Sequence, residues 1–172
     1  MLLEEQDSVA VALGDHDADV LMGRVAAAAR TVAYLSDETW RHIDRESTEE
    51  TSVEIEVAGL TVTDNEIVVL GDPSTDPLLV LHAAVQAMYS GRPIARESLR
   101  LFAERQVDLP DPWPQGARDL FVELLKGGHR AIPVIESLDY FEVWTHLLPE
   151  WTPNRSRPQR NVYHRFTVDR HL

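Results

Sequence analysis

The longest regular pattern in the chain lies between Ala18 and Ile43. Positions suited to burial recur there every three or four residues, namely Leu21, Val25, Ala28, Val32, Leu35, Thr39 and Ile43. This spacing places the side chains on one face of an α-helix over many turns, so it predicts a long amphipathic helix. Asp15 and Asp17 are its candidate N-caps, and LLEEQDSVAVAL predicts a shorter helix that ends at Gly14.

The pattern then changes to an alternation of apolar and polar residues. VEIEVAG alternates from Val53, and LTVTDNEIVVL places two β-branched runs around Asp64 and Asn65. A period of two with a short polar turn is typical of an antiparallel hairpin or a three-stranded patch. We therefore expect a small antiparallel β insertion at about residues 52–70, within an otherwise helical chain.

Helical patterns return after Asp76, with Pro77 at the first helical position of PLLVLHAAVQAMYSG. Further helices are predicted in ARESLRLFAERQ, in GARDLFVELLKGG and, as one or two short helices ending near Pro149, in AIPVIESLDYFEVWTHLLPEW. The predicted fold class is mainly α, a helical bundle with a small antiparallel β insertion. The long helix should pack against the helices that start near Asp76 and Gly116.

The composition is that of one globular domain, with 172 residues, 44% hydrophobic and 26% charged. No apolar run approaches the ~18 residues of a membrane-spanning helix, and the acidic start MLLEEQDSV does not resemble a signal peptide. The chain has no cysteine, which excludes disulfides, zinc-thiolate sites and cysteine nucleophiles. We expect a cytoplasmic protein without a membrane partner.

The net charge of −13 is unevenly distributed. Residues 151–172 hold five arginines and one aspartate, a net charge of +4, so the other 150 residues carry −17. An acidic body repels nucleic acid, so we expect no nucleic-acid partner. The basic tail could dock on an acidic surface or be a solvated arm.

GDHDAD, residues 14–19, is the most suggestive acidic stretch. A calcium-binding EF-hand loop needs glycine at its sixth position and glutamate at its twelfth, where this chain has Val20 and Ala26. Asp15 and Asp17 could be the paired carboxylates of a nucleotidyltransferase, but such a pair follows a Gly-Ser loop on a strand, whereas this pair opens a helix. His16 and Asp17 could be a His-Asp metal pair, although helix capping explains the stretch more simply.

The remaining candidates do not complete an active site. Histidine occurs at positions 16, 42, 82, 129, 146, 164 and 171, without an HExxH motif or a tight metal-binding spacing. His82 falls in an apolar helix, where a packed side chain is the default, and His129 follows two glycines and is expected at the surface.

The C-terminal segment PEWTPNRSRPQRNVYHRFTVDRHL, residues 149–172, resembles the middle of the bifunctional uridylyltransferase/uridylyl-removing enzymes, which modify the PII signalling protein. The residues that carry this resemblance are Pro149, Glu150, Trp151, Gln159, Tyr163, His164, Phe166, Thr167, Val168, Asp169 and His171. ARTVAYLSDETW, the hairpin leading into DPLLVLHAAVQA, and ARDLFVELL also look like the central helical region of that family, and the arginine-rich linker looks most like its actinobacterial members.

The resemblance implies a domain order. Residues 1–150 would be the helical middle domain, of the type associated with nucleotidyltransferases, and residues 151–172 a linker and the first helical turn of a truncated His-Asp hydrolase domain, with Thr167 as N-cap. The transferase motif would precede Met1 and the His-Asp pair would follow Leu172. His171 would be the first metal ligand of an incomplete site. Magnesium or manganese, UTP and the PII protein are implied as cofactors and partner of the parent enzyme, with no cofactor bound by this chain alone.

Two functions follow from these observations. In the first, the chain supports the nucleotidyltransferase site of such an enzyme but lacks both catalytic motifs. In the second, it is a stand-alone, non-catalytic helical module that binds another protein through its acidic face. Residues beyond about Trp151 are expected to be less ordered than the body, or held by a neighbouring molecule, because the helices that would support them are missing.

Overall fold

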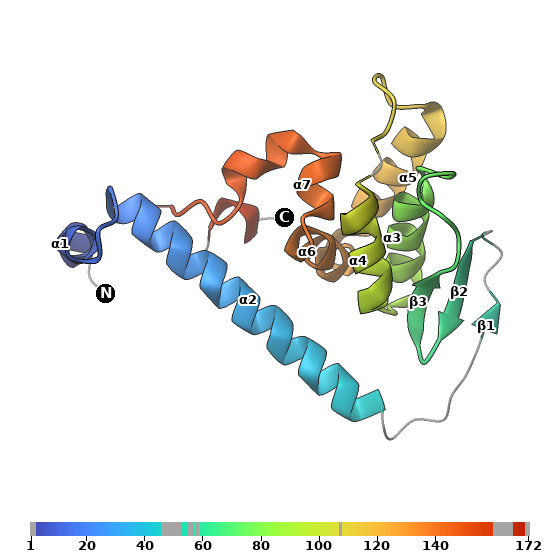
Figure 1. Ribbon diagram of the computed structural model, residues 1–172, viewed down its shortest axis with the longest axis horizontal. Helices are drawn as coiled ribbons and strands as arrows, with labels where there is room; N and C mark the ends of the chain where they lie inside the picture. The colour runs from blue at the N-terminus through green and yellow to red at the C-terminus, as the bar shows by residue number, and fades with distance from the viewer. Residues whose placement is uncertain are drawn as a thin grey trace. The chain divides into compact units, whose positions relative to one another are not determined.

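The computed structural model describes residues 3–45, 53–54, 57, 59–106, 108–159 and 167–170. The chain divides into two compact units, Met1–Thr39 together with Glu150–Leu172, and Trp40–Pro149. Its elements, labelled in Figure 1, are α1 (Leu3–Leu13), α2 (Ala18–Arg45), β1 (Val53–Glu54), β2 (Leu60–Thr63), β3 (Glu66–Val69), α3 (Leu79–Ser90), α4 (Arg96–Arg105), α5 (Gln115–Lys126), η1 (Gly128–Arg130), α6 (Ile132–Tyr140), α7 (Val143–Leu147), η2 (Pro149–Asn154) and η3 (Val168–Arg170). The mainly helical fold with a small β insertion is confirmed.

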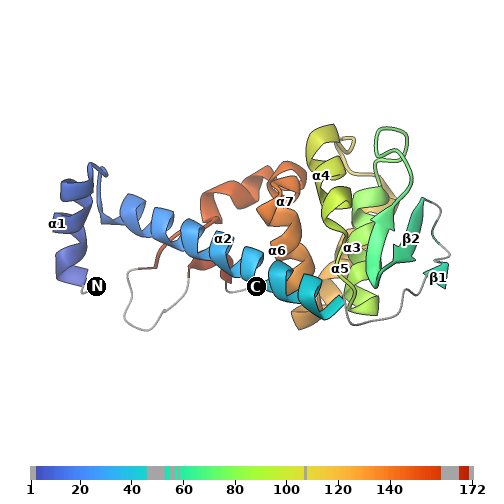
Figure 2. The ribbon, with the colours of Figure 1, turned by 60° about the horizontal axis from the view of Figure 1, so that its bottom comes forward.

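The first unit contains most of α2, which at 28 residues is the longest helix, as predicted. Figure 2 shows it as one continuous rod. The α1 helix ends at Gly14, whose φ of 77° suits glycine. The backbone N–H of Asp15 donates to Ala10 at 2.9 Å, and the N–H of Ala18 donates to the Asp7 carboxylate at 3.3 Å. These bonds fix the corner between the two helices.

Only the start of the predicted apolar stripe of α2 is buried. Leu21 is 5% exposed, whereas Val25, Val32, Leu35 and Ile43 are between 41% and 67% exposed. The helices against which α2 was expected to pack belong to the second unit, so that contact stays a prediction.

The β insertion forms as expected. Its three strands pair in the order β1-β2-β3, and both pairings are antiparallel. Asp64 and Asn65 turn the chain between β2 and β3 with φ angles of 52° and 62°. Two consecutive positive φ angles match the twist of a tight hairpin, which explains why Asp-Asn stands at this position.

The second unit is built around α3, which packs against β3, α5 and α6. Eight of its twelve residues are buried, so this helix is apolar on nearly every side. It begins at Leu79 rather than at Pro77, because Asp76 instead closes the preceding turn by accepting the N–H of Leu78 at 3.0 Å. It ends at Gly91, which has a φ of 68°.

The β insertion is attached to the helices through backbone and side-chain bonds. Ile67 forms a parallel bridge with Ile94, just before α4. The buried hydroxyl of Ser98, in α4, accepts the N–H of Val69 at 2.9 Å. An unsatisfied buried donor costs about 1–3 kcal/mol, so Ser98 supports the end of β3. The sheet is therefore an insertion within the helical unit.

Candidate functional site

The described part of the C-terminal motif contains one buried carboxylate. Asp169, in η3, is 5% exposed and forms an ion pair with Arg30 of α2. The same carboxylate oxygen, Oδ2, accepts the N–H of Ser156 at 2.8 Å. The N–H of Val168 also donates to the carbonyl of Arg157 at 2.9 Å. All of these residues belong to the first unit, so the motif is tied to the middle of the long helix.

The ion pair between Arg30 and Asp169 is largely shielded from solvent. The side chain of Asp169 is 1% exposed and that of Arg30 is 17% exposed. Charges at this depth are stabilised only when they are paired, and removing one partner strands the other in a poorly solvating environment. The second oxygen of Asp169, Oδ1, is buried without a hydrogen-bond partner in the part of the chain that the structure describes. The carboxylate therefore retains capacity to accept a further donor.

The segment after Trp151 was expected to be a linker, and the structure shows local contacts in its first part. The η2 helix runs over Pro149–Asn154, and Ser156 is 9% exposed. The reason is the interaction of Ser156 with Asp169, which sequence patterns could not reveal because the partners are separated along the chain. The predicted helical turn near the end is present as η3, a 3₁₀ turn. How ordered the tail is relative to the body stays a prediction.

The acidic stretch at residues 14–19 does not bring its carboxylates together. Asp17 accepts the N–H of Val20 at 2.9 Å and is thus the N-cap of α2, as predicted. Asp15 instead forms an ion pair with Arg24, nearly two turns into the helix. His16 is exposed, and its Nδ1 lies 2.9 Å from the Asp17 carboxylate. The N–H of Val20 and then the His16 hydrogen bond lower the pKa of Asp17 from its usual 3.8.

His171, the one residue with a predicted metal-binding role, lies outside the described residues. Within the described ranges, no three His, Cys, Asp or Glu side chains are arranged to hold a metal ion. These residues therefore do not fit the magnesium or manganese that the family resemblance implies. His129 is exposed, as predicted, and His82 is partly buried in α3.

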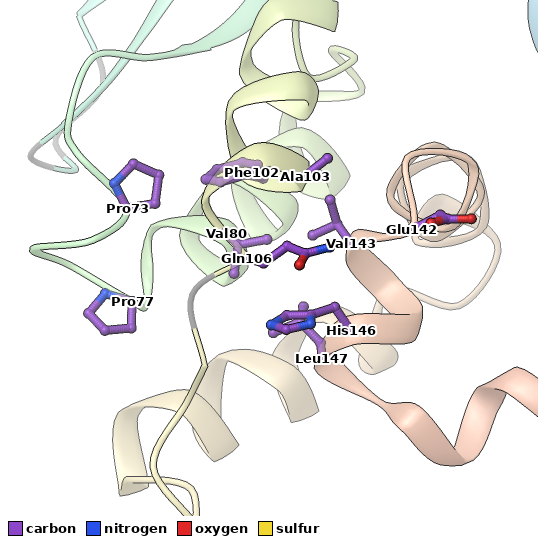
Figure 3. Close-up of a pocket in the computed structure, with 10 residues that line it drawn as sticks. All are labelled: Pro73, Pro77, Val80, Phe102, Ala103, Gln106, Glu142, Val143, His146 and Leu147. Atoms are coloured by element: carbon purple, nitrogen blue, oxygen red, sulfur yellow. The ribbon is translucent and has the colours of Figure 1, made fainter.

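A small pocket opens in the second unit, between the turn before α3 and the helices α4 and α7. Figure 3 shows Pro73 and Pro77 on one side, Phe102 and Ala103 above, and His146 and Leu147 opposite. The cavity volume of this pocket is about 20 Å³, which is room for roughly one or two water molecules. The lining is largely apolar.

His146 is one of three polar residues that line this pocket, together with Gln106 and Glu142. Its Nε2 lies 3.0 Å from the Asp108 carboxylate, within ion-pair distance but outside the angular range of a hydrogen bond. Sequence reasoning did not single out His146, because its neighbours come from three separate segments. No hydroxyl, thiol or amine side chain accompanies these three residues among the described residues that line the pocket. The small volume and the mainly apolar lining suit an apolar side chain.

Among the described residues, no helix is both long enough and apolar enough to cross a membrane.

Comparisons with known proteins show that the chain is similar to part of longer proteins. No family model matches it, and no solved structure matches it significantly. It is 38% identical, over 195 aligned positions that include the whole chain, to the bifunctional uridylyltransferase/uridylyl-removing enzyme of Streptomyces coelicolor. It is 44% identical over 109 positions, 62% of the chain, to the enzyme of the same name from Mycobacterium tuberculosis, strain H37Rv. It is 31% identical over 96 positions, 56% of the chain, to the one from Corynebacterium glutamicum.

The chain spans only a part of these relatives. The matched region is 23% of the Streptomyces protein and 14% of each of the other two. In the Streptomyces protein it is a central region, in agreement with the resemblance found in residues 149–172. The chain therefore belongs to the family of actinobacterial bifunctional uridylyltransferase/uridylyl-removing enzymes, as a homologue of their central region.

Proposed function

We propose that this chain is the helical middle region of a PII-protein uridylyltransferase/uridylyl-removing enzyme of nitrogen regulation, and that it supports the nucleotidyltransferase site without containing a catalytic motif. The observation that carries this proposal is the 38% identity over the whole chain to one central region of a much longer bifunctional enzyme. In such an enzyme the transferase and hydrolase chemistry would reside in the parts on either side, and UTP, magnesium or manganese, and the PII protein would bind there, in the cytoplasm.

The chemistry of the described residues supports a structural role. Nucleotidyl transfer needs carboxylates that converge on a metal ion, which aligns the phosphates and offsets the charge of the leaving pyrophosphate. Here Asp17 is engaged as a helix cap, Asp15 is paired with Arg24, and Asp169 is paired with Arg30. Each carboxylate therefore stabilises a junction between elements.

The proposal is tested with the purified chain and with the longer enzyme that contains it. The chain alone should add no uridylyl group to PII with UTP and magnesium, and should remove none from uridylylated PII with manganese, as measured by the intact mass of PII. The longer enzyme should do both. Turnover by the chain, after removal of any trace of longer enzyme, would mean that it holds an active site, and residues 14–19 would be the first place to look.

A longer enzyme that neither adds uridylyl groups to PII nor removes them from uridylylated PII would overturn the proposed function. The genomic sequence gives a second test. The reading frame should continue on both sides with a Gly-Ser loop and paired aspartates upstream and a His-Asp pair downstream. A frame that lacks them would favour the stand-alone interaction module instead.

A further inference from the structure

Three segments of the first unit meet at the carboxylate of Asp169. Arg30 comes from the middle of α2, Ser156 follows η2, and Asp169 lies in η3. Arg30 and Asp169 are far apart in sequence but form an ion pair whose side chains are both largely buried. The N–H of Ser156 adds a second donor to the same oxygen at 2.8 Å. The site thus joins the long helix to the chain segment that leaves the helical region.

The ion pair between Arg30 and Asp169 favours one position of η3 along α2 over other positions. A buried ion pair contributes little net stability compared with apolar residues, because both ions lose their hydration. Any displacement of η3 along α2, however, would leave Arg30 or Asp169 without its partner, which is strongly unfavourable. The planar guanidinium of arginine adds a directional requirement that a lysine ammonium does not. A pair of this kind acts mainly by selecting a position.

We propose that Arg30 and Asp169 are positioning residues, which fix the start of the hydrolase part against the long helix of the middle region, so that uridylyl removal depends on this pair and uridylyl transfer does not. The inference rests on the proposed function for its activity readout. Its structural half, the attachment of η3 to α2 by this pair, can be tested on the chain itself.

The attachment is measured by amide hydrogen exchange in the chain. In Arg30→Met, which keeps a long apolar stem but removes the charge, the amides of Ser156 and Val168 should exchange at least about tenfold faster, because Asp169 loses its partner. Arg30→Lys keeps the charge and should restore part of the protection. The amide of His82, bonded to Leu78 at 2.9 Å within the second unit, reports global unfolding and should not change.

Arg24→Met is the matched control. Arg24 lies on the same helix and also forms an ion pair, but with Asp15 at the corner after α1. This variant should leave the exchange of Ser156 and Val168 unchanged. Equal acceleration in Arg24→Met and Arg30→Met would mean that any charge loss on α2 releases the tail, and unchanged exchange in Arg30→Met would mean that the pair does not hold it. Either result overturns the proposal.

The functional half is tested in the longer enzyme with the same three variants. Arg30→Met should lower kcat for uridylyl removal by about tenfold or more, with kcat/KM for transfer unchanged, and Arg30→Lys should recover part of the loss. Equal loss of both activities would indicate general destabilisation and overturn the positioning role. Faster exchange with normal removal would also overturn it. A wild-type enzyme with neither activity would instead contradict the proposed function, while the exchange data would still decide whether the pair attaches η3.

Discussion

Asp17 shows how one residue can suggest several chemistries and perform a local structural task. Its position beside His16 and Asp15 suggests three different metal-site patterns, none of which the sequence completes. Its carboxylate nevertheless accepts the N–H of Val20, one of the backbone groups at the start of α2 that have no partner within the helix. The negative charge also lies at the positive end of the helix dipole. The capping role accounts for this residue without any ligand.

Asp17→Ala should therefore lower the melting temperature of the chain, by roughly a few degrees, because the Val20 N–H loses its acceptor. The folded pKa of Asp17 lies below 3.8, so the contribution of the carboxylate is complete above pH 3.8 and is lost as the pH falls through the folded pKa. The difference in melting temperature between wild type and variant should thus shrink under acidic conditions, as followed by circular dichroism.

Asp17→Asn separates the contribution of the capping hydrogen bond from that of the negative charge. The asparagine oxygen can still cap the helix, so this variant should melt above Asp17→Ala at neutral pH. It has no titrating carboxylate, so it should lack the acid-dependent part of the effect. A difference between wild type and Asp17→Ala that is the same at every pH would show that the charge of Asp17 is irrelevant.

At the scale of elements, most boundaries follow from local pattern. The 3.6-residue period predicts α2, and the two-residue period with Asp64-Asn65 predicts the hairpin, because both signals arise from residues close in sequence. The start of α3 was misplaced by two residues, since Asp76 can cap either the helix or the preceding turn. The attachment of η3 was not predictable, because nothing local distinguishes Arg30 from other arginines.

The packing of α3 against α5 depends on Gly127, the residue that follows α5. A Cβ on Gly127 would lie 2.6 Å from Cγ and 2.7 Å from Sδ of Met88, and 3.0 Å from the carbonyl of Leu124. Met88 is 1% exposed and has little space into which it could move. The φ of Gly127 is −61°, which any residue can adopt, so the requirement for glycine is purely steric.

Gly127→Ala should therefore destabilise the chain by about 1–3 kcal/mol in urea unfolding, the usual cost of overpacking. Truncating Met88 to alanine in the same chain should remove the clash, so the double variant should cost less than the sum of the two single variants. Gly128→Ala is the control. Gly128 has a φ of 55° and no atom within 4 Å of a Cβ, so its cost is conformational and should add to that of Met88→Ala without coupling. Additive costs for Gly127→Ala would contradict the steric explanation.

At the scale of the whole molecule, the chain consists of two units that meet different physical demands. The second unit has a core of its own, with Ile67, Leu81, Leu124 and Leu138 fully buried. The first unit is an assembly of α1, most of α2 and the C-terminal segments, held at corners by polar contacts such as Asp15 with Arg24 and Asp169 with Arg30. A part with few buried apolar residues depends more strongly on the precise placement of charges.

The exposed stripe of α2 gives the last prediction. Leu21 and Val32 belong to the same predicted helical face, but Leu21 is 5% exposed and Val32 is 67% exposed. Leu21→Ala should cost about 2–5 kcal/mol of stability, as for a buried leucine. Val32→Ser should change stability by no more than about 0.5 kcal/mol, because it removes no buried contact. Urea unfolding of both variants at low protein concentration measures the difference. A cost for Val32→Ser as large as that for Leu21→Ala would mean that the stripe is covered within the chain, as the periodicity of α2 first suggested. A negligible cost for Val32→Ser would mean that this apolar face of α2 is exposed in the isolated chain.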